Sequence, residues 1–386
     1  MKVLFVCPAF PPKVCGVGNY AALLIKALTA LELEVSLLTG DGPVDAEQYG
    51  LSRVHTVSNW KISQKKRIQK ILQSENPDIV HIQYQQALFH PGWLGLSLPG
   101  QIKRWLPKTR IVVTQHDLNY PYLFKGAGRL GLRKPTVLKK MWEYADAIII
   151  GYQSGAEEIV GIYPATGEKL NIIPIGPGME LDLPGKGHKE EVCHKYRLDP
   201  KNMLLASFGF IYRDKDFPLI FKSLIELKRA NIKANYIHVG AEGDEKTYLF
   251  ELQKMAKDID IDSSVVFTGE QGTEETSLVL GAADIGLAIF TRSQDLGRHS
   301  TLPLMLQLGT PLIVTDEQNR VGEDAPWLAV PSGEVGELAK AIKRLNDDQS
   351  LKDNLSAKAL KAYKKHYSPQ AIGEKTVAVY RKILAQ

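Results

Sequence analysis

The sequence is poor in cysteine and has no long hydrophobic segment. Its three cysteines, Cys7, Cys15 and Cys193, are odd in number and lack metal-ligand spacing, so they predict neither a disulfide framework nor a zinc site. Apolar runs such as 147–150 are strand-length, whereas a membrane-spanning helix needs about 20 residues. The run at 2–7 is too short for a leader peptide and is followed by prolines, which predicts a buried first strand. We therefore expect a reduced, cytoplasmic protein.

Motifs of common metal-dependent and serine hydrolases are also missing. The chain has no HExxH motif, no Cys/His cluster with metal-ligand spacing and no Gly-x-Ser-x-Gly elbow. These absences remove the usual grounds for a divalent-metal site or a serine nucleophile. We expect neither a bound metal nor a resident cofactor.

Charge is nearly balanced, with a net of +5 at pH 7. Residues 1–185 hold 20 Lys and Arg against 15 Asp and Glu, and the rest of the chain holds 28 of each. So modest an excess is typical of a solvated surface, and we expect no nucleic-acid partner. Segments 91–106 and 129–140 combine basic residues with Trp or Leu, which suits either contact with anionic lipid or an amphipathic helix with a hydrated basic face.

Short apolar runs alternate with amphipathic segments along the whole chain, a rhythm typical of βαβ units. The pattern predicts the α/β class, with two doubly wound parallel sheets. The Gly- and Pro-rich segment 175–188 marks a linker, so the expected domains are 1–185 and 186–367, followed by a helix within 368–386. Strands are expected at 2–7, 34–38, 79–82, 111–114, 147–150, 203–208, 234–239, 265–268, 285–288 and 311–314.

Two loops feed the starts of predicted helices, one in each half of the chain. Gly16 and Gly18 follow the first strand, and the segment 297–301 follows the strand at 285–288. Exposed N–H groups and the helix dipole favour an anion there, which predicts a phosphate-bearing ligand between the domains. A tight turn and a plain N-cap are the alternatives. The second loop consists of Gly297, Arg298, His299, Ser300 and Thr301.

Polar residues follow several predicted strands, at the edge where open α/β sheets bind ligands. His116 could hydrogen-bond a substrate hydroxyl or carbonyl, or could simply pack. His81 and Gln83 could contact a polar ligand or could be satisfied polar groups of the core. Arg213 and Lys215 flank a turn and could neutralise a leaving diphosphate, or could be solvated.

The ordered set of these segments resembles the GT-B glycosyltransferases, and specifically glycosyltransferase family 4, over essentially the whole chain. The order and spacing of the segments carry the resemblance, more than any single motif. In the first half the matching segments are Pro8, 16–20, 78–81, 114–116, 145–146 and 173–176. In the second half they are 208–215, 238–243, 267–269, 282–284 and 309–314.

The resemblance implies two Rossmann-like domains facing a central cleft, with a nucleotide-sugar donor held mainly by the second and an acceptor mainly by the first. It implies sugar transfer with retention of the anomeric configuration and without a metal. The expected donor is a UDP- or GDP-sugar, and the acceptor a glycan, a lipid-linked molecule or a small molecule, as in polysaccharide biosynthesis. The C-terminal helix is expected to cross back onto the first domain. A peripheral position at the inner membrane face, through the basic N-terminal domain, is compatible with this.

The resemblance also implies roles for individual residues. His116 is expected to face the donor sugar, and Lys215, aided by Arg213, to neutralise the leaving diphosphate. Gly16 and Gly18 are expected near the diphosphate, which the 297–301 loop grips through its backbone. The residues expected at the nucleotide are Gly240, Gly269 and Glu270.

Three positions depart from the family pattern. The two glutamates of the family's Glu-x7-Glu motif align with Leu296 and Leu304, and the basic residue expected after Gly209 is Phe210. The alternative function is therefore a catalytically silent protein of the same fold that binds a glycan or a partner glycosyltransferase. An epimerase would need a pair of carboxylates in the cleft, and a phosphorylase a lysine-bound pyridoxal site, and neither is evident.

Overall fold

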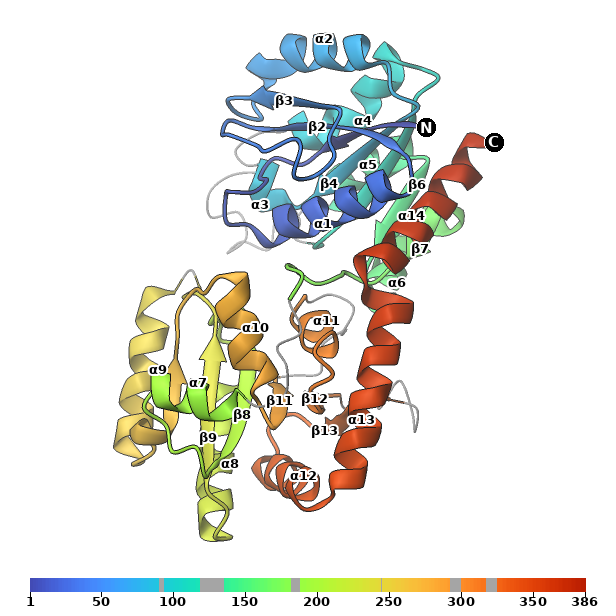
Figure 1. Cartoon of the computed structure of the whole chain (residues 1–386). Helices are drawn as coiled ribbons and strands as arrows, with labels where there is room; N and C mark the ends of the chain where they lie inside the picture. Colours follow the sequence, from blue (N-terminus) through green and yellow to red (C-terminus); the bar gives the residue numbers. More distant parts are fainter. Residues whose placement is uncertain (90–93, 119–134, 182–187, 244, 292–299, 317–324) are drawn as a thin grey trace. The chain divides into compact units, whose positions relative to one another are not determined.

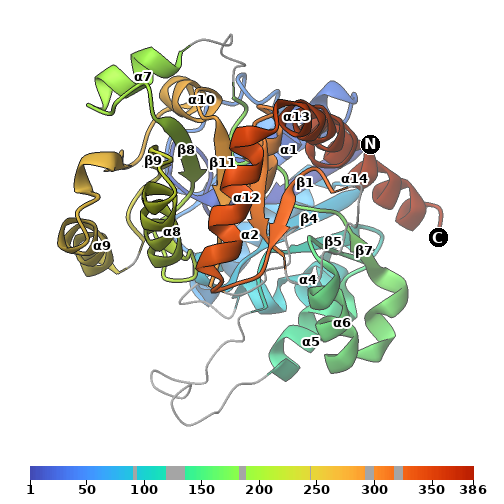
Figure 2. The same cartoon turned by 90° about the horizontal axis from the view of Figure 1, so that it is seen from below.

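The computed structural model describes residues 1–89, 94–118, 135–181, 188–243, 245–291, 300–316 and 325–386. The chain folds into two compact units. Unit 1 consists mainly of Met1–Gly178 and Pro369–Gln386, and unit 2 of Met179–Gln294 and Thr301–Ser368. Figure 1 and Figure 2 show a twisted sheet flanked by helices in each unit.

Unit 1 is built on a seven-stranded sheet in which all neighbouring strands run parallel, in the order β3-β2-β1-β4-β5-β6-β7. Its central strands are buried along nearly their whole length, as expected for a parallel sheet covered on both faces. The strands are β1 (Lys2–Val6), β2 (Glu34–Gly40), β3 (Arg53–Val57), β4 (Ile79–Tyr84), β5 (Arg110–Gln115), β6 (Ala147–Ile150) and β7 (Leu170–Ile172).

Helices cover both faces of this sheet and form two hydrophobic clusters with it. One cluster involves α1 and α14, and the other involves α2, α4, α5 and α6. Gly373 lets α14 approach α1, because a Cβ there would lie 3.0 Å from the Cβ of Ala27. No helix of the described residues is both long and apolar enough to cross a membrane. The helices of unit 1 are α1 (Gly16–Ala30), α2 (Lys65–Glu75), α3 (Gln86–Phe89), α4 (Leu94–Trp105), α5 (Pro135–Tyr144), α6 (Gln153–Ile162) and α14 (Pro369–Leu384), with 3₁₀ turns at Ile62–Gln64 and Pro164–Lys169.

Unit 2 repeats this plan with a six-stranded parallel sheet in the order β10-β9-β8-β11-β12-β13. Its strands are β8 (Met203–Phe208), β9 (Ala234–Val239), β10 (Val265–Phe267), β11 (Ile285–Ala288), β12 (Leu312–Thr315) and β13 (Leu328–Val330). Its helices are α7 (Lys189–Lys195), α8 (Phe217–Arg229), α9 (Lys246–Asp258), α10 (Thr273–Gly281), α11 (Thr301–Leu306), α12 (Val335–Asp347) and α13 (Gln349–Ala362), with a 3₁₀ turn at Asp262–Ser264 and a π-helical turn at Tyr363–Tyr367.

In both units the strand order reverses beside the first strand, between β1 and β4 and between β8 and β11. The prediction of the α/β class with two doubly wound parallel sheets is thereby confirmed. The sequence pattern missed the edge strands β3, β7 and β13, whose side chains are partly exposed and so form no continuous apolar run. The expected boundary at residue 185 falls within 182–187, outside the described residues.

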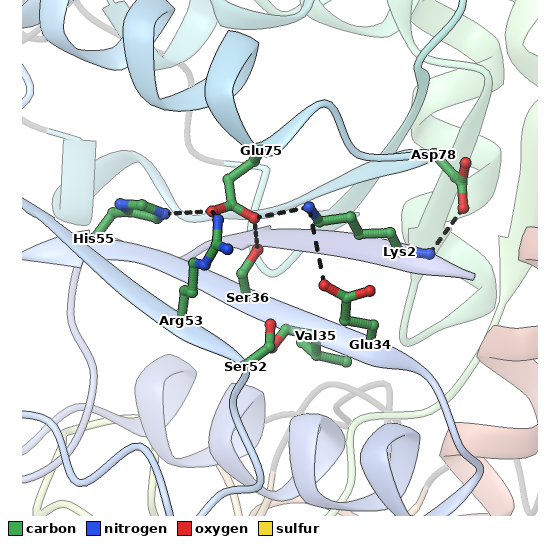
Figure 3. A network of polar contacts seen from close by, with 9 residues as sticks. All are labelled: Lys2, Glu34, Val35, Ser36, Ser52, Arg53, His55, Glu75 and Asp78. Carbon is green, nitrogen blue, oxygen red and sulfur yellow. Dashed lines mark hydrogen bonds and ion pairs between the residues drawn. The ribbon is translucent and has the colours of Figure 1, made fainter.

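A buried carboxylate, Glu75 at the end of α2, ties the first three strands of unit 1 together (Figure 3). It accepts hydrogen bonds from Ser36 on β2 at 3.2 Å and from His55 on β3 at 2.8 Å. The ammonium group of Lys2 on β1 lies 3.5 Å away and the guanidinium of Arg53 lies 3.3 Å away. Burial alone raises the pKa of Glu75, but His55 and Lys2 more than offset this and hold the net pKa below its usual value.

We expect Glu75→Gln to destabilise unit 1 by about 1–3 kcal/mol at pH 7, because the charged partners lose their buried counter-charge. A carboxylate with a lowered folded pKa contributes stability above its unfolded pKa and loses it as the pH falls through the folded value. The difference from wild type should therefore shrink below about pH 4. Urea unfolding monitored by tryptophan fluorescence at pH 7 and at about pH 3 measures both effects.

The matched control for this prediction is Glu34→Gln. Glu34 lies 3.9 Å from the same lysine, but its side chain is 57% exposed. Its replacement should change the free energy of unfolding by less than about 0.5 kcal/mol. Equal losses in the two variants, or a loss in Glu75→Gln that does not depend on pH, would contradict the assignment.

Candidate functional site

The first candidate region is the start of α1, directly after β1. Gly16 begins the helix, and a Cβ at this position would meet no atom within 4 Å. A Cβ at Gly18 would lie 2.5 Å from the carbonyl oxygen of Ala9, so only glycine fits there without a shift of the backbone. The N-cap residue Cys15 makes no side-chain capping bond, and the first turn holds no acidic residue. The positive end of α1 is thus not neutralised by the capping residue or by its own first turn.

His116 follows β5 at the same edge of the sheet and is 7% exposed. Its Nε2 lies 2.8 Å from Oε1 of Gln83, whose Nε2 lies 3.2 Å from Nε2 of His81. His81 also contacts the hydroxyl groups of Thr114 and Tyr380. Burial lowers the pKa of both histidines to about 3, so both rings are neutral at physiological pH. The polar groups after β4 and β5 therefore form one buried network.

The second candidate region lies at the end of β8 in unit 2. The ammonium group of Lys215 donates a hydrogen bond to the carbonyl oxygen of Phe208 at 2.9 Å and lies 5.3 Å from the centre of the Phe290 ring. The hydroxyl group of Thr301, the first residue of α11, lies 3.4 Å from the same carbonyl. Gly209, with φ of +112°, lies between them, because its Cβ would be 3.1 Å from that hydroxyl and 3.3 Å from the ammonium nitrogen.

The electrostatic state of Lys215 suits an anion. Burial lowers its pKa to about 8, although the carboxylate of Asp214 acts in the opposite direction. No carboxylate of the described residues lies within ion-pair distance of the ammonium group. At neutral pH the side chain is therefore mostly protonated and can take an anionic ligand without first breaking an ion pair.

Arg213 is held in a different way. Its guanidinium group bonds to Glu245 at 2.6 Å and to Glu251 at 2.8 Å, and it lies 4.3 Å from the centre of the Tyr248 ring. The side chain is half exposed. Two carboxylates already balance its charge. Among the described residues its contacts are with these side chains and Tyr248, and not with the Phe208 carbonyl where Lys215 and Thr301 meet.

The residues expected at the nucleotide lie after β9 and β10. The backbone N–H of Gly240 donates to the carbonyl of Gly269 at 3.0 Å. A Cβ at Gly240, with φ of +154°, would lie 2.1 Å from the carbonyl oxygen of Gly209. The loops that follow β8, β9 and β10 are therefore packed together by their glycine backbones. Glu270 is exposed beside them.

Part of the predicted phosphate loop falls outside the described residues, namely Gly297, Arg298 and His299, as does Leu296. Ser300 and Thr301 are described, and Thr301 is buried. Leu304 is fully buried in a hydrophobic cluster with Val279 and Leu280. The position of the second family glutamate therefore belongs to the core and offers no carboxylate.

Sequence reasoning missed one polar network of unit 2. His238 on β9 donates from Nε2 to the carbonyl of Gly209 at 2.7 Å, and its Nδ1 accepts from Ser207 at 2.6 Å. The hydroxyl of Tyr236 lies 2.5 Å from that of Ser207. The sequence could have indicated this network, because Ser207 and His238 are polar residues near the carboxyl ends of two adjacent buried strands. The network fixes the carbonyl of Gly209 at the end of β8.

Comparison with known proteins supports the resemblance inferred from the sequence. Residues 14–177 match the model of Glycosyltransferase Family 4. The chain is 25% identical over 243 residues to the alpha-monoglucosyldiacylglycerol synthase of Streptococcus pneumoniae, a match that covers 61% of this chain and 51% of that relative. It is 26% identical over 276 residues to the D-inositol 3-phosphate glycosyltransferase of Mycobacteroides abscessus, covering 67% and 60% respectively. The chain thus spans about half to three fifths of these relatives.

Solved structures share the fold along the whole chain. A glycosyltransferase from Rickettsia africae superposes with a TM-score of 0.77 at 15% identity, covering 99% of this chain and 98% of that one. HepE from Anabaena, crystallised with UDP and glucose, superposes with a TM-score of 0.74 at 15% identity, covering 99% and 100%. At this identity the likeness establishes the fold, which is GT-B.

The two glycines at the start of α1 provide a matched pair of variants. Gly18→Ala should destabilise unit 1 by about 1–3 kcal/mol, because the added Cβ forces the helix away from Ala9. Gly16→Ala, with open space around the Cβ, should be neutral or slightly stabilising. Chemical denaturation of both variants measures the difference. Equal stabilities would contradict the close approach of the backbone at Gly18.

Proposed function

We propose that this GT-B protein, which resembles glycosyltransferase family 4, is a glycosyltransferase that moves a sugar from a nucleotide-sugar donor to an acceptor. The observation that carries the proposal is the group formed by Lys215, Thr301 and Gly209 at the strand-order reversal of unit 2. It combines a cation that has no carboxylate partner among the described residues with the first residue of a helix, at the edge where open α/β sheets bind ligands. A diphosphate matches this chemistry.

The proposed roles follow from charge and position. Lys215 stabilises the negative charge that develops on the leaving diphosphate, an electrostatic contribution that needs no metal. We further propose, from the family resemblance, that backbone N–H groups of the 297–301 loop and of the start of α1 at Gly16 and Gly18 bind phosphate. Neutral His116 faces the donor sugar. Arg213 assists Lys215 from the neighbouring turn, to a smaller extent because Glu245 and Glu251 already share its charge. The nucleotide is held near Gly240, Gly269 and Glu270, and the anomeric configuration is retained.

The donor we propose is a UDP- or GDP-sugar, with UDP favoured because the similar HepE was crystallised with UDP and glucose. The acceptor is a glycan, a lipid-linked molecule or a small molecule. One relative is named for a glucosyldiacylglycerol, which is a lipid, and another for an inositol phosphate, which is a small molecule. We place the protein in the cytoplasm, in contact with the inner membrane face through basic residues of unit 1. On α4, Lys103 is paired with Asp146 at 2.6 Å, which leaves Arg104 as the more available cation.

Nucleotide binding tests the proposal directly. Thermal unfolding of the purified protein would be followed with UDP, GDP, ADP, TDP and CMP, each with and without a chelator. A ligand at about 100 times its Kd stabilises the folded state by about 2.7 kcal/mol, which raises the Tm by roughly 5–10 °C for a domain of this size. We expect such a shift with UDP or GDP, unchanged by the chelator. No shift with any nucleotide would favour the catalytically silent alternative.

Removal of the Lys215 charge should slow transfer from the nucleotide sugar that binds. We expect Lys215→Met to lower kcat/KM about a hundredfold, because developing negative charge loses its partner. In wild type kcat/KM should fall as the pH rises through about 8, where Lys215 loses its proton, and the variant should lack this decline. Lys222→Met on the exposed side of α8 is the control and should keep wild-type activity.

Arg213 is tested by the same assay. Because its guanidinium is already bound by Glu245 and Glu251, we expect Arg213→Met to cost only about tenfold. A loss below about threefold would remove Arg213 from the catalytic groups, and the same result for Lys215→Met would overturn the assignment of Lys215.

A further inference from the structure

The last helix of the chain contributes a side chain to the buried network around His116. Tyr380 on α14 is fully buried, and its hydroxyl oxygen lies 2.5 Å from Nδ1 of His81, a residue 299 positions earlier in the sequence. From His81 the contacts continue through Gln83 to Nε2 of His116, at 3.2 Å and 2.8 Å. All four side chains belong to unit 1.

The directions of these hydrogen bonds depend on one another. The amide oxygen of Gln83 faces His116, so Nε2 of His116 must carry the hydrogen. The amide nitrogen of Gln83 faces Nε2 of His81, so this nitrogen is the acceptor, and its single lone pair is shared with the Thr114 hydroxyl at 2.7 Å. A neutral His81 then carries its single hydrogen on Nδ1 and donates it to Tyr380. Whether a ring nitrogen of His81 or His116 donates or accepts is thus set by the side chain that it contacts.

We propose that Tyr380 is a positioning residue that fixes the tautomer of His116 through His81 and Gln83. The consequence is that Nδ1 of His116 is the ring nitrogen without a hydrogen, and it can accept a hydrogen bond from a hydroxyl group such as those of a sugar. The relevance to transfer rests on the proposed function, in which His116 faces the donor sugar. The tautomer itself is a property of the free protein.

Removal of the Tyr380 hydroxyl should reverse the direction of the hydrogen bonds from His81 through Gln83 to His116. An unpaired buried N–H on Nδ1 of His81 is costly, whereas a hydrogen on Nε2 can be donated to Thr114. A hydrogen on Nε2 of His81 in turn requires the amide of Gln83 to rotate and present its oxygen. The amide N–H then faces His116, which must move its own hydrogen to Nδ1. The reversed tautomer can no longer accept at that nitrogen.

The test is the protonation pattern of His116 in full-length protein labelled with ¹⁵N-histidine. Long-range ¹H–¹⁵N correlation spectra identify the protonated nitrogen, and a His116→Gln spectrum assigns the signal. We expect hydrogen on Nε2 in wild type and on Nδ1 in Tyr380→Phe. Tyr196→Phe is the matched control, because it removes a hydroxyl bonded to Glu275 at 2.7 Å in unit 2, and it should leave His116 unchanged. The proposal is overturned if wild type carries the hydrogen on Nδ1 or if Tyr380→Phe leaves it on Nε2.

A second variant separates this route from a general loss of packing. In a Gln83→Leu background the connection is cut, so adding Tyr380→Phe should cause no further change in the His116 signals. With UDP-glucose as the probe, Tyr380→Phe should lower kcat/KM roughly tenfold, as loss of a group that orients a histidine typically does. If His116→Gln turns over UDP-glucose normally, the role of His116 in the proposed function fails, while the spectra still decide the tautomer.

Discussion

Every strand of both sheets runs parallel to its neighbours, and the functional interpretation depends on this constraint. Parallel strands must be joined by crossover helices, so all loops that follow strands lie at one edge and all residues that precede strands lie at the other. The two edges of each sheet therefore carry different chemistry. At the amino ends Asp146 and Asp284 are paired. At the carboxyl ends Lys215 has no ion pair among the described residues, and the buried histidines His81 and His116 are neutral.

The amino edges show the first of these patterns. Asp146, just before β6, pairs with Lys103 at 2.6 Å and accepts the backbone N–H of Ile111 at 2.7 Å. Asp284, just before β11, pairs with Lys189 at 2.6 Å and accepts the backbone N–H of Leu204 at 2.7 Å. Both aspartates lie in segments that carried the family resemblance. Their contacts are structural, because each joins two neighbouring strands far from the carboxyl-edge loops.

A feature could be predicted from the sequence where a local residue pattern encodes it, and could not where it depends on contacts with distant residues. The central strands were predictable because a strand buried on both faces is a continuous apolar run, and the loops after them follow from parallel topology. The edge strand β3 was not, since most of its side chains are only partly buried, and those of Arg53 and His55 pair with Glu75. Lys215 was predicted as a cation near phosphate, but its separation from Arg213 depends on Glu245 and Glu251, which lie on a later helix or directly before it. The roles of the site residues themselves stay predictions.

The network at His116 shows what a single sequence cannot reveal. His81 and Gln83 lie two residues apart on β4, so a strand pattern places both on one face. No pattern near them in the sequence indicates that His81 contacts Tyr380 on α14. That contact exists because α14 packs against α1, where Gly373 leaves room for Ala27 and hydrophobic residues of the helix join the core of unit 1. Yet α14 follows directly on the π-helical turn that ends unit 2. The chain therefore completes the polar network of unit 1 only after unit 2 has been made, so a protein cut before Pro369 lacks both the packing partner of α1 and the hydroxyl that His81 contacts.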